Sequence, residues 1–581
     1  MDEVRRVSVS ASCPDMGKML PWDTFDNWVH AICVVTFDLE LGQAMELVLP
    51  SASRLGDQER SSVCYLAFPD SNSGCMGDTP FFFRMMRSAE EATRLSDVQL
   101  RYNSQCPPSL QIDSAFLYGF AYFRQVKDRS LRRGYFQKSV VLLTRYPFVN
   151  LFTKVMELVA PEFFDGDGST APLEAACADI DRWPEPVPGH SLALPVRGHT
   201  FQVRLPAQED KLLPCAPLPR RPSRPAAASS SVVASVAEPE LFTALQPLLA
   251  HAQLLWELVI TAEPLVVMAP TPAVSSHVVQ ALASLVWPLR YCGDHRPFFT
   301  IHDTDFKELT QLGSNQAPPP VILGVTNPFF AKTLQHWPHI LRLGESPPAA
   351  RMTSSQLKNK TKKGGSLKTL DGKPGLYTQY KPFLQKDKSL EKRLWSGQQT
   401  ERPQEVQSAL LRRYLLELTQ SFVLPLERYI ATLMPLQRSI SPYKAAPVMR
   451  PFDPDQFCER LADSGPQLTT GIKGDWVGLY RRFFRSANFS HWFNERHDDI
   501  SRKLRALHLE ALSDADVLSW VKGRPEVEVV DLVLRLRRKL AEAGADRLPV
   551  HATTLSKLRL HLHDVLRSLP EDVRAVLKPP S

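Results

Sequence analysis

The side chains that could do chemistry in this sequence are few, and none belongs to a complete catalytic pattern. The nearest match to a phosphate-binding loop is Lys362-Lys363-Gly364-Gly365-Ser366. A phosphate cradle needs backbone amides at the start of a helix that follows a strand, because the helix dipole then favours the anion. This run lies instead in a polar, lysine-rich stretch. A solvated loop is therefore the favoured interpretation, with a phosphate site as the alternative.

Histidine and cysteine spacing does not indicate a metal site either. His561 and His563 are two residues apart, and His491 and His497 are six apart. Side chains on one helix face are three or four residues apart, so neither pair can hold one metal ion from a single helix. The nine cysteines form no Cys-x-x-Cys pair, and the motifs of nucleotide loops, zinc proteases and serine hydrolases are missing. We predict no catalytic residue, no metal and no cofactor.

The middle of the chain alternates apolar strands with helices. Strands are predicted at 264–268, 298–302 and 321–325, and helices at 241–260, 273–286 and 305–312. This order is typical of a parallel sheet, whose functional loops lie beyond the carboxyl ends of the strands. The candidate contact residues there are Thr300, His302, Asp303, Thr326, Asn327, Pro328, Phe329 and Phe330.

The loop after the third strand is the most unusual of these. Asn327 can cap a following helix, and Pro328 fits its first position. Phe329 and Phe330 then fall in the first turn, where one could face outward. Core filling and partner contact are equally good interpretations of the two rings. Asp303 could likewise be only a helix cap.

The rest of the chain must position these loops. A hairpin is predicted from 31–37 and 43–49 with its turn at Gly42, followed by strands at 81–83, 116–123 and 139–143 and then helices at 150–160 and 173–181. The C-terminal third is helical, with a kink expected at Pro425, an end at Pro435 and a helix cap at Gly544.

The fold class is therefore α/β and α+β, multidomain. The predicted parts are a disordered leader (1–21), an antiparallel upstream module (22–205), a Pro/Ala/Ser-rich linker (206–237), a central doubly wound parallel α/β module (238–350), a basic insert or loop (351–402) and a helical downstream module (403–581).

Composition excludes several functional classes. The 581 residues are 43% hydrophobic and 23% charged, which suits several folded domains. The net charge of +7 is mild, which disfavours nucleic acid as a partner. Residues 351–402 hold 13 Lys/Arg against 4 Asp/Glu, a local charge of +9. A solvated loop is the slightly favoured interpretation of this segment, and weak contact with an anionic membrane is the alternative.

The predicted location is the cytoplasm. No run of 18 apolar residues occurs, and the N-terminal 21 residues contain no apolar signal segment. The odd number of scattered cysteines indicates a reducing compartment rather than a disulfide framework.

Several stretches, in order along the chain, resemble the DENN-domain family. They are 37–43, 66–70 and 118–125, which look like its upstream, longin-type module; 256–258, 262–270, 299–303 and 324–330, which look like its central module; and 412–429, which looks like its downstream helical module. The resemblance extends from about Trp22 to the C-terminus. One departure is Ala262, where relatives commonly carry glycine, and it puts the local turn geometry in doubt.

The resemblance implies guanine-nucleotide exchange on a Rab-type small GTPase in endosomal recycling, with recruitment from the cytoplasm to endosomal membranes. In that family the GTPase sits against the longin and central lobes, and its switch regions are displaced until GDP leaves, without a chemical catalytic residue. Two alternatives stay open. One is a Rab-binding adaptor, and the other is a GTPase-activating partner, for which Arg124 is a conceivable arginine finger.

Overall fold

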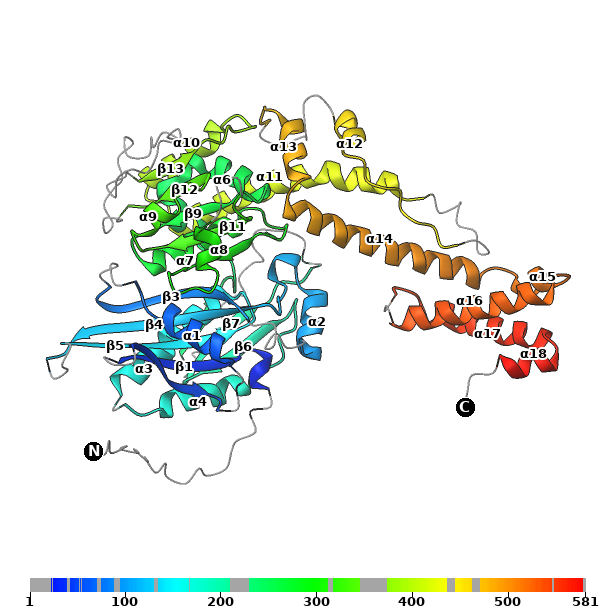
Figure 1. Ribbon diagram of the computed structural model, residues 1–581, viewed down its shortest axis with the longest axis horizontal. Helices are drawn as coiled ribbons and strands as arrows, with labels where there is room; N and C mark the ends of the chain where they lie inside the picture. Colours follow the sequence, from blue (N-terminus) through cyan, green and yellow to red (C-terminus); the bar gives the residue numbers. More distant parts are fainter. Residues whose placement is uncertain are drawn as a thin grey trace, which may run out of the picture. The chain divides into compact units, whose positions relative to one another are not determined.

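The computed structural model describes most of the chain between Trp22 and Leu577 (Figure 1). It leaves out residues 23, 39–41, 52, 54, 71–74, 88–94, 130–133, 167, 209, 211–228, 312–316, 345–373, 436–444, 462–470 and 546–547. The chain divides into two compact units. The first comprises residues 1–250, 264–284 and 294–379, and the second comprises 251–263, 285–293 and 380–581.

The first unit begins with a five-stranded antiparallel sheet, as predicted. Its strands are β1 (Ala31–Asp38), β2 (Gly42–Leu49), β3 (Gly77–Met86), β4 (Phe116–Lys127) and β5 (Tyr135–Thr144), in the order β2-β1-β5-β4-β3. The predicted hairpin is confirmed, and Gly42 has a φ of 76°, which glycine adopts at little cost. Two helices that we did not predict, α1 (Asp57–Leu66) and α2 (Asp97–Gln105), lie between strands.

Both faces of this sheet are buried, which explains its long apolar runs. Successive side chains of a strand point to opposite faces. Phe82 and Phe120 therefore pack with the predicted helices, which form α3 (Val149–Asp165) and α4 (Ala171–Asp181). Phe81 and Phe83 pack on the other face with side chains of α1.

The linker prediction (206–237) is wrong near its C-terminal end, where a strand forms. Strands β6 (Ser191–Val196) and β7 (His199–Arg204) form a hairpin, and β8 (Ser229–Val233) pairs with β7 in parallel. The His199 ring lies 2.5 Å from Ser229 Oγ and 2.8 Å from Ser231 Oγ. The composition of this stretch suggested a linker, but pairing with a distant strand gives its backbone groups partners.

The second sheet holds the predicted α/β core, with an antiparallel edge. Its strands are β9 (Leu265–Met268), β10 (Asp294–Arg296), β11 (Val321–Val325), β12 (His339–Arg342) and β13 (Gly375–Thr378), in the order β10-β11-β9-β12-β13. The first four are parallel, and β13 is antiparallel to β12. The middle sheet is therefore mixed rather than all parallel.

Two local predictions in this region are wrong. Residues 298–302 form no strand, because Pro297 ends β10 and Phe299 N–H makes a single further bond to Gly324 O (2.7 Å). The helix predicted at 241–260 is broken into α5 (Leu241–Leu245), a 3₁₀ turn (Gln246–His251) and α6 (Ala252–Ile260), with Pro247 at the break. The other predicted helices form α7 (Pro272–Ala283) and α8 (Phe306–Thr310).

Gly324 is where β11 meets α7 most closely. A Cβ atom there would lie 2.3 Å from both Pro297 O and Ser275 Oγ. Ser275 Oγ also donates a hydrogen bond to Pro297 O (2.8 Å). Only glycine fits, and its lack of a side chain allows the helix to cover this face of the sheet.

The second unit is helical beyond residue 403, as predicted, and a further helix, α10, precedes that point. Its helices are α6, α10 (Lys388–Gln399), α11 (Gln404–Leu433), α12 (Pro454–Arg460), α13 (Trp476–Phe483), α14 (Ala487–Ser513), α15 (Val517–Val521), α16 (Glu526–Ala545), α17 (Ala552–Ser568) and α18 (Glu571–Val576). Helix α11 contains Pro425 and ends at Leu433. Helix α16 continues through Gly544, so Gly544 is not a helix cap.

The basic segment 351–402 is not wholly a loop, because β13 and α10 form within it. Residues 351–373 of that segment, including the lysine–glycine run, lie outside the described residues.

The end of α6 explains the departure at Ala262. Glu263 N–H bonds Leu258 O (2.8 Å) and Ala262 N–H bonds Val259 O (3.0 Å), which together form a Schellman motif. Ala262 therefore takes the left-handed conformation, with a φ of 53°. This conformation is costly for a residue with a Cβ atom and easy for glycine.

Ala262→Gly should therefore stabilise the second unit by about 1 kcal/mol, seen as a higher midpoint of thermal unfolding. Ala541→Gly, at an exposed position inside α16, is the matched control and should lower the midpoint. A lower midpoint for Ala262→Gly would contradict this account of the turn.

Glu257 of α6 is fully buried and holds the chain that follows β13. Its carboxylate accepts hydrogen bonds from Phe383 N–H (2.9 Å), Leu384 N–H (3.1 Å) and the Tyr380 hydroxyl (3.4 Å). Burial raises the pKa of Glu257 from 4.5 to about 7, and these three hydrogen bonds oppose that rise. Gln253, one turn earlier, accepts a bond from Asp387 N–H (2.9 Å).

This carboxyl should make stability depend on pH. Because the pKa of Glu257 is higher in the folded state, its contribution is fully present below about pH 4.5 and is lost as the pH rises through 7. The loss is on the order of 3 kcal/mol. Glu257→Gln, which cannot titrate, should flatten the change in the urea midpoint of the second unit between pH 5 and 8. Equal pH dependence in both proteins would contradict the assignment.

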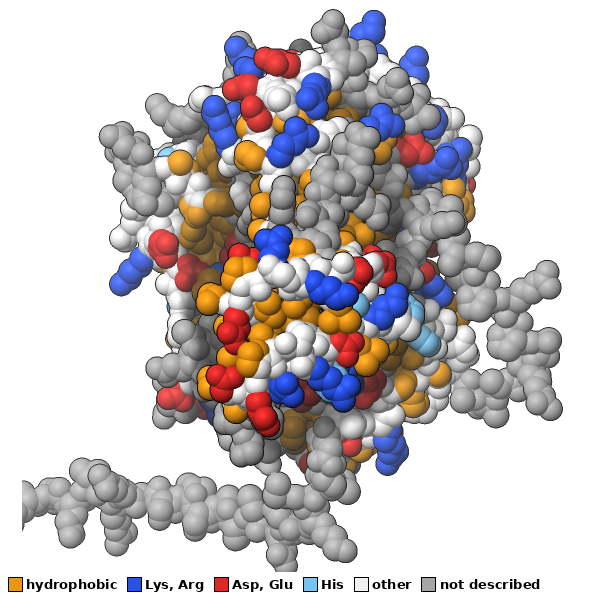
Figure 2. All heavy atoms as spheres, turned by 90° about the vertical axis from the view of Figure 1, so that its right-hand side faces the viewer, with side chains coloured by type: hydrophobic (Ala, Val, Ile, Leu, Met, Phe, Trp, Pro, Cys, Tyr) orange, Lys and Arg blue, Asp and Glu red, His pale blue; other side chains and the backbone are white. Residues whose placement is uncertain are grey.

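No helix among the described residues is long and apolar enough to cross a membrane. Figure 2, which looks onto α15–α18, shows hydrophobic side chains exposed among charged ones. The most exposed large hydrophobic side chains of these helices are Val527, Leu534, Leu560 and Val576.

Candidate functional site

The two large sheets of the first unit meet along a seam of specific contacts. Ser276 Oγ of α7 donates to Phe82 O of β3 (2.5 Å), and the rings of Phe81 and Phe298 are 5.5 Å apart. Arg84 of β3 donates to Asp294 of β10, with 2.5 Å between Nη1 and Oδ1. Arg84 and Arg296 lower the pKa of Asp294 by their charge, which outweighs the effect of burial. The two sheets are therefore held in one fixed relation.

At one end of this seam lie the loops that follow β10 and β11. The His302 ring stacks on Tyr65 of α1, with centroids 4.2 Å apart and planes at 13°. Thr326 Oγ1 donates to Asp70 Oδ2 (2.7 Å), and burial raises the pKa of Asp70. We call this surface, built from residues 300–304 and 326–330 with Tyr65 and Asp70, the loop edge.

A hydrogen bond between two residues of the loop after β10 stabilises that loop. Asp303 Oδ2 accepts a hydrogen bond from Thr300 N–H (2.8 Å), and burial raises the pKa of Asp303 to about 6. Thr300 is buried, so it supports the loop rather than forming its surface, whereas His302 is exposed. The N-cap of α8 is Asp305, so Asp303 is not the predicted helix cap.

The structure separates the two phenylalanines that the sequence left equivalent. Phe330 is fully buried in the core beside Phe299. Phe329 is 48% exposed, and its ring stacks on Phe306 at 6.3 Å. Asn327 Oδ1 accepts from Phe329 N–H (3.0 Å), although α9 (Phe330–Thr333) begins two residues later than predicted. Phe329 is thus an apolar side chain held at the surface of the loop edge.

Tyr65 and Asp70 were missing from the predicted site. Asp70 falls inside the stretch 66–70 that carries the family resemblance, but the sequence analysis assigned it no role in the site. Tyr65 had no signal, because α1 was not predicted. Among the described residues, no group of three histidine, cysteine, aspartate or glutamate side chains could hold a metal ion.

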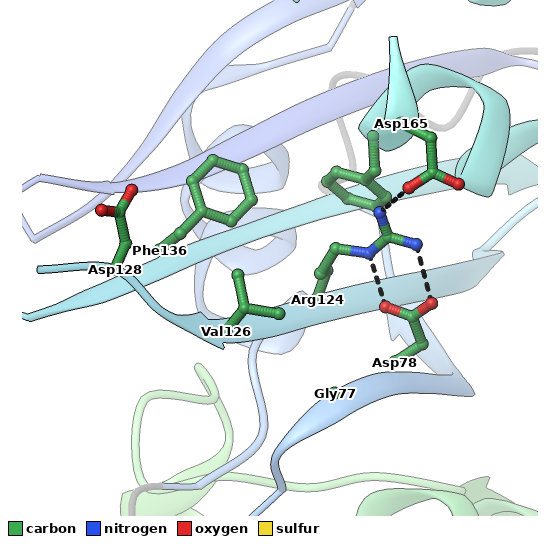
Figure 3. Close-up of a pocket in the computed structure, with 8 residues that line it drawn as sticks. Gly77, Asp78, Arg124, Val126, Asp128, Phe136 and Asp165 are labelled. Carbon is green, nitrogen blue, oxygen red and sulfur yellow. Dashed lines mark hydrogen bonds and ion pairs between the residues drawn. The ribbon is translucent and has the colours of Figure 1, made fainter. Parts of the chain in front are cut away.

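Arg124 is not available as an arginine finger. Its Nε and Nη2 lie 2.6 Å and 2.8 Å from the two oxygens of Asp78, and its Nη1 bonds Asp165 (Figure 3). These hydrogen bonds raise the pKa of Arg124 and lower that of Asp78. Because its Nε, Nη1 and Nη2 already donate to two carboxylates, Arg124 would have to break these hydrogen bonds before it could bind a γ-phosphate.

Comparison with known proteins decides the family. Human Protein DENND6B is 54% identical over 561 residues, covering 96% of this chain and 94% of the human protein. This chain belongs to the DENND6 family. Protein DENND6A of Gallus gallus is 51% identical, covering 97% of this chain and 95% of that protein, and the Protein DENND6 homolog of Dictyostelium discoideum is 32% identical over 88% of this chain and 77% of its own length.

Two family models match parts of the DENND6 chain. The model described as DENND6 C-terminal domain matches residues 517–580, where α15–α18 lie, and the model described as Transport protein Avl9 matches residues 29–170, which include β1–β5. The predicted membership of the DENN family is confirmed, and the higher identity to the human B-type relative favours the B form.

Proposed function

We propose that this DENND6 chain is a guanine-nucleotide exchange factor that promotes GDP release from a Rab-type small GTPase in membrane traffic. The observation that carries the proposal is the loop edge. It presents an exposed aromatic side chain, Phe329, and the His302–Tyr65 stack where two fixed sheets meet. Family membership supports the proposal, because the DENN-domain family resembled by this sequence acts on Rab GTPases.

The loop edge would act by contact rather than by covalent chemistry. If the exchange factor and GDP bind the GTPase antagonistically, each weakens the binding of the other by the same factor. Acceleration of release by about 10⁴-fold needs roughly 5.5 kcal/mol of differential contact. An interface of about 1,600 Å² with a few aromatic anchors can supply this. We assign the contact roles to His302, Asp303, Thr326, Asn327, Pro328 and Phe329, with Thr300 and Phe330 supporting them from below.

The alternative function, a GTPase-activating partner, is disfavoured because its candidate arginine finger, Arg124, already binds Asp78 and Asp165. An adaptor role without exchange activity is favoured by one observation, the exposed hydrophobic side chains on α16–α18. We place the protein in the cytoplasm with recruitment to recycling endosomes, and the basic segment 351–402 is the proposed weak membrane contact.

Nucleotide-state preference separates these functions. The full chain should bind a nucleotide-free or GDP-loaded Rab more tightly than the same Rab loaded with a non-hydrolysable GTP analogue. An activating partner or a GTP-dependent adaptor would show the reverse preference, and that result would overturn the proposal.

A further inference from the structure

Helix α10 of the second unit (Figure 1) buries one side and exposes lysines on the other. Leu390 and Leu394, four residues apart, are buried. Lys388 and Lys392, also four residues apart, are exposed and lie on the opposite side of the helix. Trp395 follows Lys392 by three residues, so its partly exposed indole lies on the lysine side. We call the side formed by Lys388, Lys392 and Trp395 the α10 face.

The α10 face keeps an excess of positive charge. Glu391, beside it, is paired with Lys386 (2.8 Å between Oε2 and Nζ). Asp387 precedes the helix, and its Oδ1 accepts a hydrogen bond from a backbone N–H of the first turn (2.8 Å). Arg393 adds a further exposed cation. Among the residues that the structure describes, no carboxylate forms an ion pair with Arg393 or with either lysine of the face. Residues 386–393 thus hold four cations and two carboxylates, and the excess is exposed.

The opposite side of α10 is already used for packing. Gln407 of α11 donates a hydrogen bond to Leu394 O (3.0 Å). A Cβ atom at Gly397 would lie 2.3 Å from the Gln407 side chain, so α10 and α11 approach closely at this glycine. Because the leucines of α10 are buried in the protein, they are not available to insert into a bilayer. A ligand of this helix would therefore meet the lysines and the indole.

These features indicate an anionic lipid surface as the ligand. Lysine side chains are attracted by the negative surface potential of a membrane, and tryptophan prefers the boundary between headgroups and acyl chains. Residues 351–373, which lie outside the described residues, add seven Lys/Arg against one Asp/Glu. Cations on a helix and along a further stretch of chain suit an extended anionic plane better than one compact ligand.

We propose that the α10 face binds an anionic lipid bilayer, with Lys388 and Lys392 among the headgroups and Trp395 at their boundary with the acyl chains. The inference rests on the membrane recruitment in the proposed function, and it assigns that contact to one side of one helix. Binding is peripheral, because the apolar side of α10 packs within the protein.

The test is sedimentation of the full-length chain with vesicles of phosphatidylcholine that contain about 30% phosphatidylserine, at about 0.15 M salt. Binding to vesicles of phosphatidylcholine alone should be at least about tenfold weaker. Raising the salt to about 0.5 M should release the protein, because salt screens the attraction. Equal binding to both kinds of vesicle would overturn the proposal. So would tighter binding to soluble polyglutamate than to the anionic vesicles, because an acidic protein would then be the better partner.

Charge reversal locates the contact. Each lysine near an anionic surface contributes roughly a fivefold change in binding, so Lys388→Glu/Lys392→Glu should bind at least about tenfold more weakly. Trp395→Ala should also weaken binding. Lys503→Glu/Lys522→Glu, at two exposed lysines of the same unit, changes the net charge equally and should bind like wild type. The melting temperature of each variant shows whether it is folded. Unchanged binding by folded Lys388→Glu/Lys392→Glu would overturn the assignment.

A second measurement separates this inference from the exchange function. GDP release from a soluble Rab, measured without vesicles, should be the same for Lys388→Glu/Lys392→Glu and wild type. Vesicle binding that is unchanged in this variant overturns the α10 face alone. Lack of GDP release by the wild-type chain overturns the exchange function and leaves the vesicle result to stand by itself.

Discussion

Replacing Phe329 by alanine is expected to reduce the acceleration of GDP release by about 30-fold. Aromatic anchors at protein interfaces commonly contribute 2 kcal/mol or more, which corresponds to about this factor. Phe329 is 48% exposed and already stacked on Phe306, so little conformational freedom is lost when a partner covers it. Stability should stay within about 0.5 kcal/mol, because the ring is at the surface. The measurement is the GDP release rate against the concentration of each variant.

Leu100→Ala is the matched control, since Leu100 is an exposed hydrophobic side chain (45%) on α2 of the same unit. It should exchange GDP at the wild-type rate. If Phe329→Ala also exchanges at that rate while folded, the loop edge is not the contact surface.

Replacing Phe330 by alanine should instead destabilise the first unit by about 3–5 kcal/mol. The Phe330 ring is fully buried, 5.8 Å from the ring of Phe299 and 6.0 Å from that of Phe306. Its removal leaves a cavity beneath the loop edge. Thermal unfolding should show a fall of many degrees in the transition of this unit, and any loss of exchange should follow the loss of folded protein.

Phe330→Leu keeps most of the apolar volume and should lose much less stability than Phe330→Ala. A Phe330→Ala protein with wild-type stability would mean that this ring does not fill the core as described.

The sequence predicted the elements whose pattern is local. The strands of the first sheet are continuous apolar runs, and the hairpin turn is marked by Gly42. It could not predict pairing that depends on distant residues. Strand β8 lies in a stretch with linker composition, and β13 lies in a basic one, yet each adds to a sheet built elsewhere in the chain. Pro297 ended β10 in a run of residues whose side chains favour strands.

The site shows the same division. The loop at residues 326–330 follows from the strand pattern, whereas residues 298–302 were predicted as a strand and form no strand in the fold. The separate positions of Phe329 and Phe330 depend on the packing of α8 and α9 against the sheet. Tyr65 joins His302 across 237 positions, and no spacing rule in the sequence connects them. At Ala262 the sequence did indicate a structural feature. The alanine that stands where relatives commonly carry glycine takes the left-handed conformation in the fold.

The most direct test of the central claim is the release of a fluorescent GDP analogue from a panel of purified Rab proteins, with and without the full chain. We expect strong acceleration for one or two Rabs, rising with the concentration of the chain. No acceleration of any Rab by folded protein would contradict the exchange function and favour the adaptor role.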